Sequence, residues 1–475
     1  MKKKFMLMLL LFALMVGLNP HTITQAQTTN TQGEQFEQGK YDLQAESPFG
    51  QNWNRNSLYA GTENPKVKWE YKLYQKDTKE IPQSISTPRF EAQPAIGRDG
   101  TIYATTFTGF NTHVNKKLYA FNPDGSVKWK KEIMGGGYNP PVIAEDGTIY
   151  VAAGNLIAFN PDGVIKWQTK GSHIIDTPVL DRDGTIYVRN VEGKRLEAYN
   201  PDGSKKWSSN EFIRGSYGSI LISKDGTIYI LDVDLGNKYL YAYDKNGKEL
   251  WHKYVKGEYG GKGFTLGINN EILVNTQDKL YVFDKNGNIV HQWKEKDNEG
   301  LLSAPTISSK DGTIYVGGKG YIYAYNPDYS IKWKYPIKKG YPQEAPVIDK
   351  NGVIYAETDS ELYALNPDGT LKWSLPKSTT YFSVGDANKS IAIGKDGTLY
   401  ILGRYISSNS DDNYTSLIAI GDDYTDNVCT KESTYMEVLK SLRAKSKKAK
   451  LTEDEKKEAR DILKELSDDL DKKDN

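Results

Sequence analysis

The residues of this chain that could do chemistry are few and scattered. Apart from His21 near the N-terminus, the histidines are His113, His173, His252 and His291, which lie in different parts of the sequence without the close spacing of metal ligands. The single cysteine, Cys429, has no second cysteine to pair with inside the chain. No Gly-x-Ser-x-Gly segment indicates a hydrolase nucleophile. The sequence therefore predicts neither a metal site nor a covalent catalytic centre.

Acidic turn sequences are the other chemistry-bearing feature. Segments of the types Asp-Arg-Asp-Gly, Asp-Lys-Asn-Gly and Asn-Pro-Asp-Gly recur, and each resembles a fragment of a calcium-binding loop. None continues into the Gly-x5-Glu spacing that supplies the bidentate ligand of such a loop. Asp and Asn also hydrogen-bond their own backbone in turns, and Gly accepts the positive φ that tight turns need. These segments therefore predict turns, and the elements on either side should be strands.

The turns divide the chain into repeated units. The signature Asp-Gly-Thr-Ile-Tyr has two variants, at Asn351 and Asp396, and a degenerate copy at Asn269. A second signature, a turn followed by a strand that reaches a Trp, recurs at intervals of 38 to 44 residues. A period near forty residues is typical of a β-propeller. The intact first signatures start at Asp99, Asp146, Asp183, Asp225 and Asp311.

Each unit contains four predicted strands. In the unit that includes Trp333, they are Ala304–Ser308, Thr313–Val316, Tyr321–Tyr325 and a strand that starts at Ile331. These runs are rich in β-branched and aromatic residues, and turn sequences separate them. One unit therefore predicts one antiparallel four-stranded blade.

The number of signatures predicts how the ring closes. The chain has eight copies of the first signature but only seven Trp residues downstream of them. The unit that contains Ser416–Ile420 ends without its Trp strand. A strand of this type occurs near the other end of the chain, in Lys66–Tyr71, which contains Trp69. A blade shared between the two ends removes both open sheet edges. We therefore expect an all-β, eight-bladed propeller over residues 66–421, closed by an N-terminal strand.

Residues 1–26 are typical of a secretory signal peptide. Three lysines precede an apolar run from Phe5 to Leu18, and small residues end the segment at Ala26. The run is short for a membrane-spanning helix, and an uncleaved anchor is the alternative. We expect an exported protein, secreted or extracytoplasmic, without a lipid anchor and without a membrane span after cleavage.

Two further segments flank the predicted propeller. Residues 27–65 are polar and predict a flexible leader followed by a docking segment around Trp53. Residues 422–475 change to a helical period and predict a charged helical hairpin, with helices over 433–449 and 452–471. Its apolar stripe favours packing on its own domain or on the sister helix, and binding of a partner is the alternative.

The charge balance excludes one class of partner. The chain has 62 basic and 61 acidic residues, so it lacks the basic surplus typical of nucleic-acid or anionic-membrane binding. Its 33 tyrosines lie mostly in the strand signatures, where packing in the core is the expected role.

The repeat Leu-Tyr-Ala-Phe/Tyr-Asn-Pro-Asp-Gly-Ser-x-Lys-Trp resembles the pyrroloquinoline-quinone-like (PQQ-like) propeller repeat with its tryptophan-docking motif. The resemblance covers residues 66–420 and implies that the Trp of each outer strand stacks between blades. Members include quinone-dependent alcohol dehydrogenases and non-catalytic scaffolds such as the outer-membrane assembly lipoprotein, so the fold does not decide the function. The docking residues that the resemblance implies are Trp69, Trp129, Trp167, Trp207, Trp251, Trp293, Trp333 and Trp373.

Comparison with the same family argues against a quinone-dependent dehydrogenase. The dehydrogenases of this family commonly place a vicinal Cys pair above the quinone, and they often add a haem-binding Cys-x-x-Cys-His. With Cys429 alone, outside the propeller, this chain has neither motif. A quinone-dependent dehydrogenase is therefore the least favoured function, and no cofactor is expected.

Three long connections are the best candidates for a binding surface. Segments 72–92, 105–117 and 403–415 exceed the usual length of strand connections, and the topology should bring them to one face above the first and eighth blades. They mix aromatic rings with both charges, a composition typical of binding hot spots. The candidate residues are Arg89, Phe90, Glu91, Phe107, Phe110, His113, Arg404, Tyr405, Asp411, Asp412 and Tyr414.

Four polar residues form a second candidate site. Each lies two positions before the Pro that opens an inner strand, a position that should ring the mouth of the central channel. Such residues could bind a cation or a small ligand, and solvated strand starts are the alternative. They are Asn139, Asp176, Ser303 and Glu344.

Together these observations favour an exported, monomeric, non-catalytic scaffold. We expect it to bind a protein, or another cell-envelope or extracellular macromolecule, on its loop-bearing face. The alternative is a carbohydrate-binding or glycan-processing propeller, which the aromatic residues of the three connections suggest. Glycosidase chemistry would also need two carboxylates that face each other across a cleft, a pairing that the sequence does not reveal.

Overall fold

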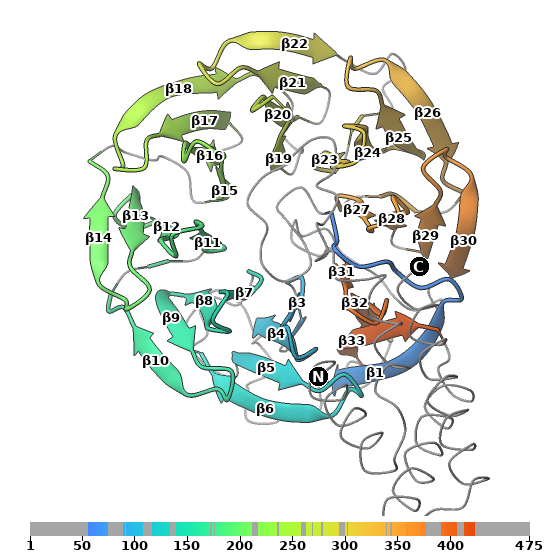
Figure 1. Cartoon of the computed structure of the whole chain (residues 1–475), viewed down its shortest axis with the longest axis horizontal. Coiled ribbons are helices and arrows are strands. Elements are labelled where there is room, and N and C mark those ends of the chain that lie inside the picture. The colour runs from blue at the N-terminus through green and yellow to red at the C-terminus, as the bar shows by residue number, and fades with distance from the viewer. Residues whose placement is uncertain are drawn as a thin grey trace, which may run out of the picture. The chain divides into compact units, whose positions relative to one another are not determined.

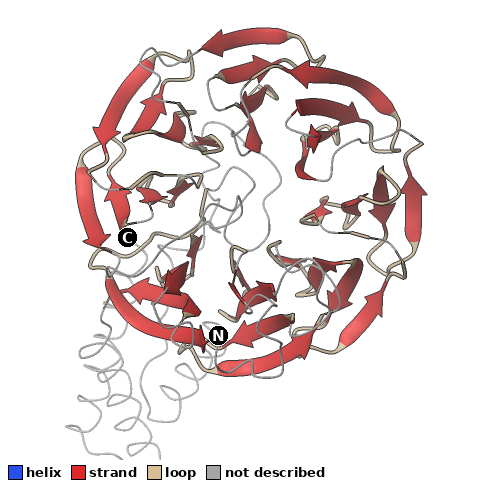
Figure 2. Ribbon diagram, turned by 180° about the vertical axis from the view of Figure 1, so that it is seen from behind, coloured by secondary structure: helices blue, strands red, loops and turns tan. Residues whose placement is uncertain are grey.

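Eight antiparallel sheets form a ring in the computed structural model of the chain (Figures 1 and 2). Each sheet is one blade, and in the described residues all regular structure is β-strand. All of these residues belong to one compact unit, Gly39–Asp422. The structure describes residues 56–74, 89–90, 92–107, 116–133, 139–171, 173–174, 176–210, 217–234, 237–257, 263–267, 269–276, 279–293, 300–301, 303–338, 340–342, 344–358, 360–376, 391–405 and 413–422.

The first four blades follow the order of the chain. Blade 1 alone has a fifth strand, because β2 and β3 both pair with β4. The strands are, for blade 1, β2 (Arg89–Phe90), β3 (Ala95–Ile96), β4 (Ile102–Phe107), β5 (Lys117–Phe121) and β6 (Val127–Glu132); for blade 2, β7 (Val142–Ile143), β8 (Ile149–Ala153), β9 (Asn155–Phe159) and β10 (Ile165–Gln168); for blade 3, β11 (Val179–Leu180), β12 (Ile186–Asn190), β13 (Arg195–Tyr199) and β14 (Lys205–Ser208); and for blade 4, β15 (Tyr217–Ile222), β16 (Ile228–Asp234), β17 (Asn237–Tyr243) and β18 (Glu249–Val255).

The last four blades have four strands each, and only blade 8 takes a strand from the other end of the chain. The strands are, for blade 5, β19 (Gly263–Leu266), β20 (Ile272–Asn275), β21 (Leu280–Phe283) and β22 (Ile289–Trp293); for blade 6, β23 (Thr306–Ile307), β24 (Ile314–Gly318), β25 (Tyr321–Tyr325) and β26 (Ile331–Pro336); for blade 7, β27 (Val347–Ile348), β28 (Ile354–Glu357), β29 (Glu361–Leu365) and β30 (Leu371–Pro376); and for blade 8, β31 (Ala392–Ile393), β32 (Leu399–Tyr405), β33 (Tyr414–Gly421) and β1 (Lys66–Tyr74). The predicted eight-bladed propeller, closed by an N-terminal strand, is confirmed.

The two repeated signatures contact each other inside a blade. In blade 6, the Asp311 carboxylate accepts hydrogen bonds from the backbone N–H and the hydroxyl of Thr313, at 3.1 and 2.7 Å. The same carboxylate accepts a bond of 2.9 Å from Nζ of Lys332, which precedes Trp333 on the outer strand. One ion pair therefore connects the first hairpin turn with the fourth strand. The same pairing recurs as Lys68–Asp396, Lys128–Asp99, Lys166–Asp146 and Lys206–Asp183.

These contacts predict a pH dependence of stability. Burial alone would raise the pKa of Asp311, but the hydrogen bonds from Lys332, Ser308 and Thr313 outweigh it and lower the pKa to about 2. The folded-state pKa is below the unfolded value, so the charged carboxylate stabilises the fold above about pH 4 and loses this effect as the pH falls toward 2. The side chain is 48% exposed, so the effect should stay below about 1 kcal/mol. Denaturant unfolding of wild type and Asp311→Asn should differ at pH 7 and converge near pH 2. A difference that grows on acidification would contradict the assignment.

Each repeat Trp contacts the next blade. Trp167 of blade 2 donates from Nε1 to the carbonyl of Pro201 in blade 3, at 2.8 Å, and its ring lies against Gly203 of the same turn. On its own blade it packs against Tyr150, with ring centroids 5.8 Å apart. The Trp rings are half-buried rather than enclosed. The equivalent acceptors are Pro123 for Trp69, Pro161 for Trp129, Lys245 for Trp207, Lys285 for Trp251, Pro367 for Trp333 and Thr62 for Trp373.

Trp293 is the exception to this pattern. Its buried Nε1 has no hydrogen-bond partner in the described part of the chain. The facing turn carries Tyr329, with a positive φ of 69°, where the equivalent turns of blades 1–5 and 7 carry Gly. Trp293 instead packs against the rings of Tyr329 and His291, at 5.4 Å from each. The predicted docking role therefore holds here through ring contacts alone.

The close approach of Trp to Gly predicts the effect of a methyl group. A Cβ on Gly203 would lie 2.5 Å from Cδ2 of Trp167, and its φ of 87° already disfavours Ala. Gly320 has a similar φ of 79°, but its added Cβ would meet no atom within 4 Å. Gly320→Ala should cost about 1 kcal/mol from backbone strain alone, and Gly203→Ala about 2–4 kcal/mol because overpacking is added. Chemical denaturation measures both, and equal costs would show that the Trp contact is unimportant.

The hydrophobic core lies between blades. One cluster joins Phe90 and Phe121 of blade 1 to Tyr400 and Leu417 of blade 8, with Trp69 at its edge. A second cluster joins blade 7 to the opposite side of blade 8. Each blade is therefore stabilised by both of its neighbours, which makes the closing blade important for the whole ring.

The closing strand β1 is longer than predicted. It pairs with β33 over its whole length, from Lys66 opposite Gly421 to Tyr74 opposite Tyr414, with one irregularity between Val67 and Trp69. The predicted strand Lys66–Tyr71 is thus confirmed and extends by three residues. Figure 1 shows β1 as the outermost strand of blade 8, beside β33 and next to β6 of blade 1.

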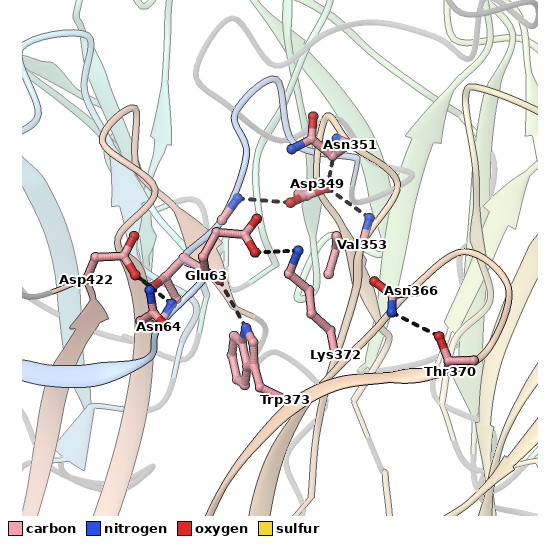
Figure 3. Close-up of polar contacts among 12 residues, drawn as sticks. Glu63, Asn64, Asp349, Asn351, Val353, Asn366, Thr370, Lys372, Trp373 and Asp422 are labelled. Carbon is pink, nitrogen blue, oxygen red and sulfur yellow. Dashed lines mark hydrogen bonds and ion pairs between the residues drawn. The ribbon is translucent and has the colours of Figure 1, made fainter. Parts of the chain in front are cut away.

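The residues before β1 replace the turn that blade 8 lacks (Figure 3). The carbonyl of Thr62 accepts the Nε1 bond of Trp373, at 3.1 Å, as a third-to-fourth strand turn does in other blades. Glu63 pairs with Lys372 at 2.6 Å, and the Asp422 carboxylate accepts bonds from the Thr62 hydroxyl and the Asn64 N–H. The two ends of the propeller chain are therefore bonded to each other.

A second set of contacts joins the residues before Thr62 to blades 6 and 7. The Asn56 amide donates to the carbonyl of Ile307 in blade 6, and Ser57 N–H donates to the carbonyl of Ile348 in blade 7, each at 2.6 Å. Gly61 N–H donates to Asp349 at 3.0 Å. Residues 56–64 thus form a closing segment across blades 6, 7 and 8, which we call the latch.

Candidate functional site

The described ends of the three long connections lie close together at blades 1 and 8. The end of β1 and the end of β32 both flank the start of β33, and β2 pairs with the end of β4. Phe90 N–H donates to the hydroxyl of Thr415, at 3.2 Å, which joins blade 1 to blade 8. The middle parts of the connections, with Glu91, Phe110, His113, Asp411 and Asp412, lie outside the described residues.

Three tyrosines stand side by side at these ends. Tyr74, Tyr414 and Tyr405 lie directly opposite one another on β1, β33 and β32, so their side chains share one side of the sheet. The ring centroids of Tyr405 and Tyr414 are 5.0 Å apart with planes at 17°, and those of Tyr74 and Tyr414 are 5.2 Å apart. All three are half-buried. We call this group the tyrosine row.

A lysine completes the tyrosine row. Lys72 Nζ lies 4.6 Å from the ring centroid of Tyr414 and 3.3 Å from the Glu70 carboxylate. Burial alone would lower the pKa of Lys72, but the Tyr414 hydroxyl and Glu70 outweigh it and raise the pKa above its usual value. The ammonium group therefore stays charged beside the rings, and the surface offers aromatic area, hydroxyl groups and one cation.

The structure corrects the prediction for two of the aromatic residues. Phe90 and Phe107 are each only 2% exposed, and both lie in strands, β2 and β4, rather than in loops. Phe90 packs against Tyr71, Tyr119 and Phe121 between blades. Buried rings of this kind stabilise the fold and offer no surface to a partner.

The two candidate arginines also lie in strands. Arg89 is opposite Phe107 in the pairing of β2 with β4, and Arg404 is opposite Thr415 in the pairing of β32 with β33. Both side chains are partly exposed. The strands of this region extend further than the repeat signatures indicate, which shortens the connections between them.

The four candidate residues of the channel mouth are buried. Asn139, Asp176, Ser303 and Glu344 are 8%, 7%, 0% and 9% exposed, so the alternative of solvated strand starts is wrong. Ser303 Oγ accepts a bond from Gly317 N–H of its own blade, at 2.7 Å. The carbonyl of Asn139 accepts a bond from Thr105 in the neighbouring blade. At Ser303 and Asn139, contacts within and between blades therefore occupy polar groups that a channel ligand would need.

Asp176 belongs to a buried ionic cluster that the sequence analysis did not identify. Arg189 lies between Asp176, at 2.5 Å from Nε, and Asp232 of blade 4, at 2.6 Å from Nη1. Burial raises the pKa of Asp176 despite the adjacent Arg189 charge. The available signal was an Arg in β12 at a position where most other blades have an uncharged residue. The cluster connects blades 3 and 4, and its full burial favours a structural role.

The described residues offer no metal centre. No group of three or more His, Cys, Asp or Glu side chains in this part of the chain could hold a metal ion. The same residues contain no helix long and apolar enough to cross a membrane.

The chain is similar to a Bacillus protein and to several solved structures. It is 33% identical over 124 residues to the uncharacterized protein YxaL of Bacillus subtilis (strain 168), a match that spans 26% of each chain. Similar solved structures include BamB from Moraxella catarrhalis, with 14% identity, a TM-score of 0.44 and coverage of 75% of this chain and 100% of that one. They also include a streptogramin B lyase, with 13% identity, a TM-score of 0.41 and coverage of 74% and 97%.

The match to a family model covers more of the chain than the match to YxaL does. A family model described as outer membrane protein assembly factor BamB matches this chain four times, at residues 66–195, 114–216, 192–337 and 291–405. The matches overlap and together run from the closing strand to blade 8, well over half of the chain. The chain therefore belongs to the BamB family of PQQ-like β-propellers.

Proposed function

We propose that this chain is an exported, non-catalytic scaffold that binds a protein partner through the tyrosine row and the connections around it. The observation that carries the proposal is the row itself. Three half-buried tyrosines from three strands, with Lys72 beside them, lie where the long connections begin and end. Tyrosines supply large contact areas at a low cost in conformational entropy, which makes them common hot spots.

The geometry of the row favours a protein over a glycan. Sugars stack on the flat faces of aromatic rings, but Tyr414 has Tyr405, Tyr74 and the Lys72 amine close to its ring. Tyr414 consequently presents its ring edge and hydroxyl group, which suit polar and apolar groups of a protein surface. Phe90 and Phe107, two of the residues that suggested a glycan, are buried.

The family description supports the same proposal. It is that of an assembly factor, a protein that acts together with other proteins. The signal peptide predicted over residues 1–26 supports export, and a change in mass on secretion would test it. The stable ring supports a role as a rigid platform for binding surfaces.

A pair of variants tests the proposal. Replacing Tyr405 and Tyr414 by Ala should weaken capture of the native partner by at least about 30-fold, since even one hot-spot aromatic contributes about 2 kcal/mol or more. Tyr254→Ala is the matched control, because Tyr254 is 53% exposed on the outer strand of blade 4. Proteins retained by the tagged chain from the native extracytoplasmic fraction are compared by quantitative mass spectrometry, with the thermal midpoint as the control for folding.

The other outcomes identify other sites. Capture that survives the double variant but is lost on removing residues 433–471 would move the site to the tail. Binding on a glycan array that depends on Tyr405 and Tyr414, without a retained protein, would favour a carbohydrate ligand. Either result would overturn the proposed function.

A further inference from the structure

A row of three residues on blade 1 combines two cations with one aromatic ring. Arg89 of β2 is directly opposite Phe107 of β4. On the other side of β4 lies β5, and Lys116 immediately precedes it, with Nζ beside the Phe107 ring. Arg89 and Lys116 therefore lie on either side of Phe107, and we call the three residues the cation row.

Both cations approach the same ring. Lys116 Nζ lies 5.3 Å from the centroid of Phe107, and Cζ of Arg89 lies 5.9 Å from it. Thr105, which shares their side of the sheet, donates to the carbonyl of Asn139 in blade 2. The cation row therefore faces blade 2, whereas the tyrosine row is on blade 8 and faces blade 7.

Lys116 is the unusual member of the row. Its side chain is buried, with 3% of the residue exposed. In the part of the chain that the structure describes, its ammonium group forms no hydrogen bond and no ion pair, and the contact with the Phe107 ring is the one polar interaction of the side chain. A buried ammonium without a counter-charge is unfavourable. Burial accordingly lowers the pKa of Lys116.

The chemistry of the cation row matches an oxyanion. A ring face compensates a cation only partly, and two cations near one ring repel each other. A carboxylate or phosphate group placed beside Lys116 would accept hydrogen bonds from the ammonium group and from the guanidinium of Arg89. We propose that the cation row is a subsite for an oxyanion carried by a bound molecule. This subsite uses no residue of the tyrosine row and goes beyond the scaffold function.

The wild-type protein gives the first test. The ε-carbon resonances of Lys116 and Lys117 are followed by NMR as a function of pH, with inorganic phosphate, acetate or chloride at equal ionic strength. Lys117 is the internal control, because it is the next residue and its side chain is on the other side of the strand. We expect a saturable rise in the pKa of Lys116 with phosphate, acetate or both, and no change for Lys117. A response to phosphate alone would identify a phosphate group, and a response to acetate alone a carboxylate.

A pair of variants gives the second test. Lys116→Met keeps the length and apolar stem of the side chain and should abolish the heat of oxyanion binding in calorimetry, whereas Lys117→Met should retain it. An unchanged Lys116 pKa in both oxyanions would overturn the subsite, as would an equal response to chloride. The wild-type titration decides the question even if Lys116→Met fails to fold.

Discussion

Removal of residues 1–74 is expected to abolish cooperative unfolding of the propeller, whereas removal of residues 1–55 should lower its thermal midpoint far less. The first deletion removes the latch and β1, and with them Trp69, Tyr71 and Leu73 from the core between blades 8 and 1. A single buried Trp→Ala change typically costs about 3–5 kcal/mol, and whole domains are stable by only about 5–15 kcal/mol. The second deletion removes none of the described residues.

An intermediate deletion separates the latch from the strand. Removing residues 1–64 keeps β1 but eliminates the bonds of Thr62 to Trp373 and of Gly61 to Asp349. Its thermal midpoint should lie between those of the other two proteins. Calorimetry and circular dichroism measure all three. If the protein without residues 1–74 unfolds like the full chain, the ring does not depend on its N-terminal strand.

The second large effect is expected at the repeat tryptophans. Trp207→Ala should cost about 3 kcal/mol, at the low end for a Trp because the ring is half-buried. The change removes the packing against Tyr187 and Gly247 and the bond to the carbonyl of Lys245. Chemical denaturation at neutral pH measures the cost.

Phenylalanine variants isolate the hydrogen bond. Trp207→Phe removes the Nε1 hydrogen bond, which should cost about 1 kcal/mol of stability. The smaller ring adds a separate cost from lost packing. Trp293→Phe provides the matched control, because the Nε1 of Trp293 has no described acceptor to lose. Equal costs at the two positions would show that the bond between blades contributes nothing measurable.

The fold was predictable because its determinants are local and repeated. Turns such as Asp311–Thr313 and the Trp that follows each third-to-fourth turn fix strand length and blade order. The surplus Trp69 revealed the closing strand, since an open ring would expose two edges. The latch was less visible, because Thr62 and Glu63 replace a turn through tertiary contacts and have no repeat signature of their own.

The site was predictable only in position. The lengths of the connections indicated where blades 8 and 1 would differ from the rest, and their described ends do meet there. Which aromatic residues remain exposed depended on tertiary packing, since Phe107 and Tyr405 both end a strand, β4 and β32, but only Phe107 is buried. The pairing of Arg189 with Asp232 joins residues 43 positions apart in different blades, and no local pattern encodes it.

Site-specific photo-cross-linking in the native compartment tests the proposed scaffold function most directly. A photoreactive phenylalanine analogue replaces Tyr405 in one protein and Tyr254, on the exposed outer strand of blade 4, in another. If the tyrosine row binds a protein, position 405 should yield a discrete covalent protein adduct, identified by mass spectrometry, and position 254 should not. An adduct at position 254 alone, or none at position 405 in a correctly folded and exported chain, would contradict the account.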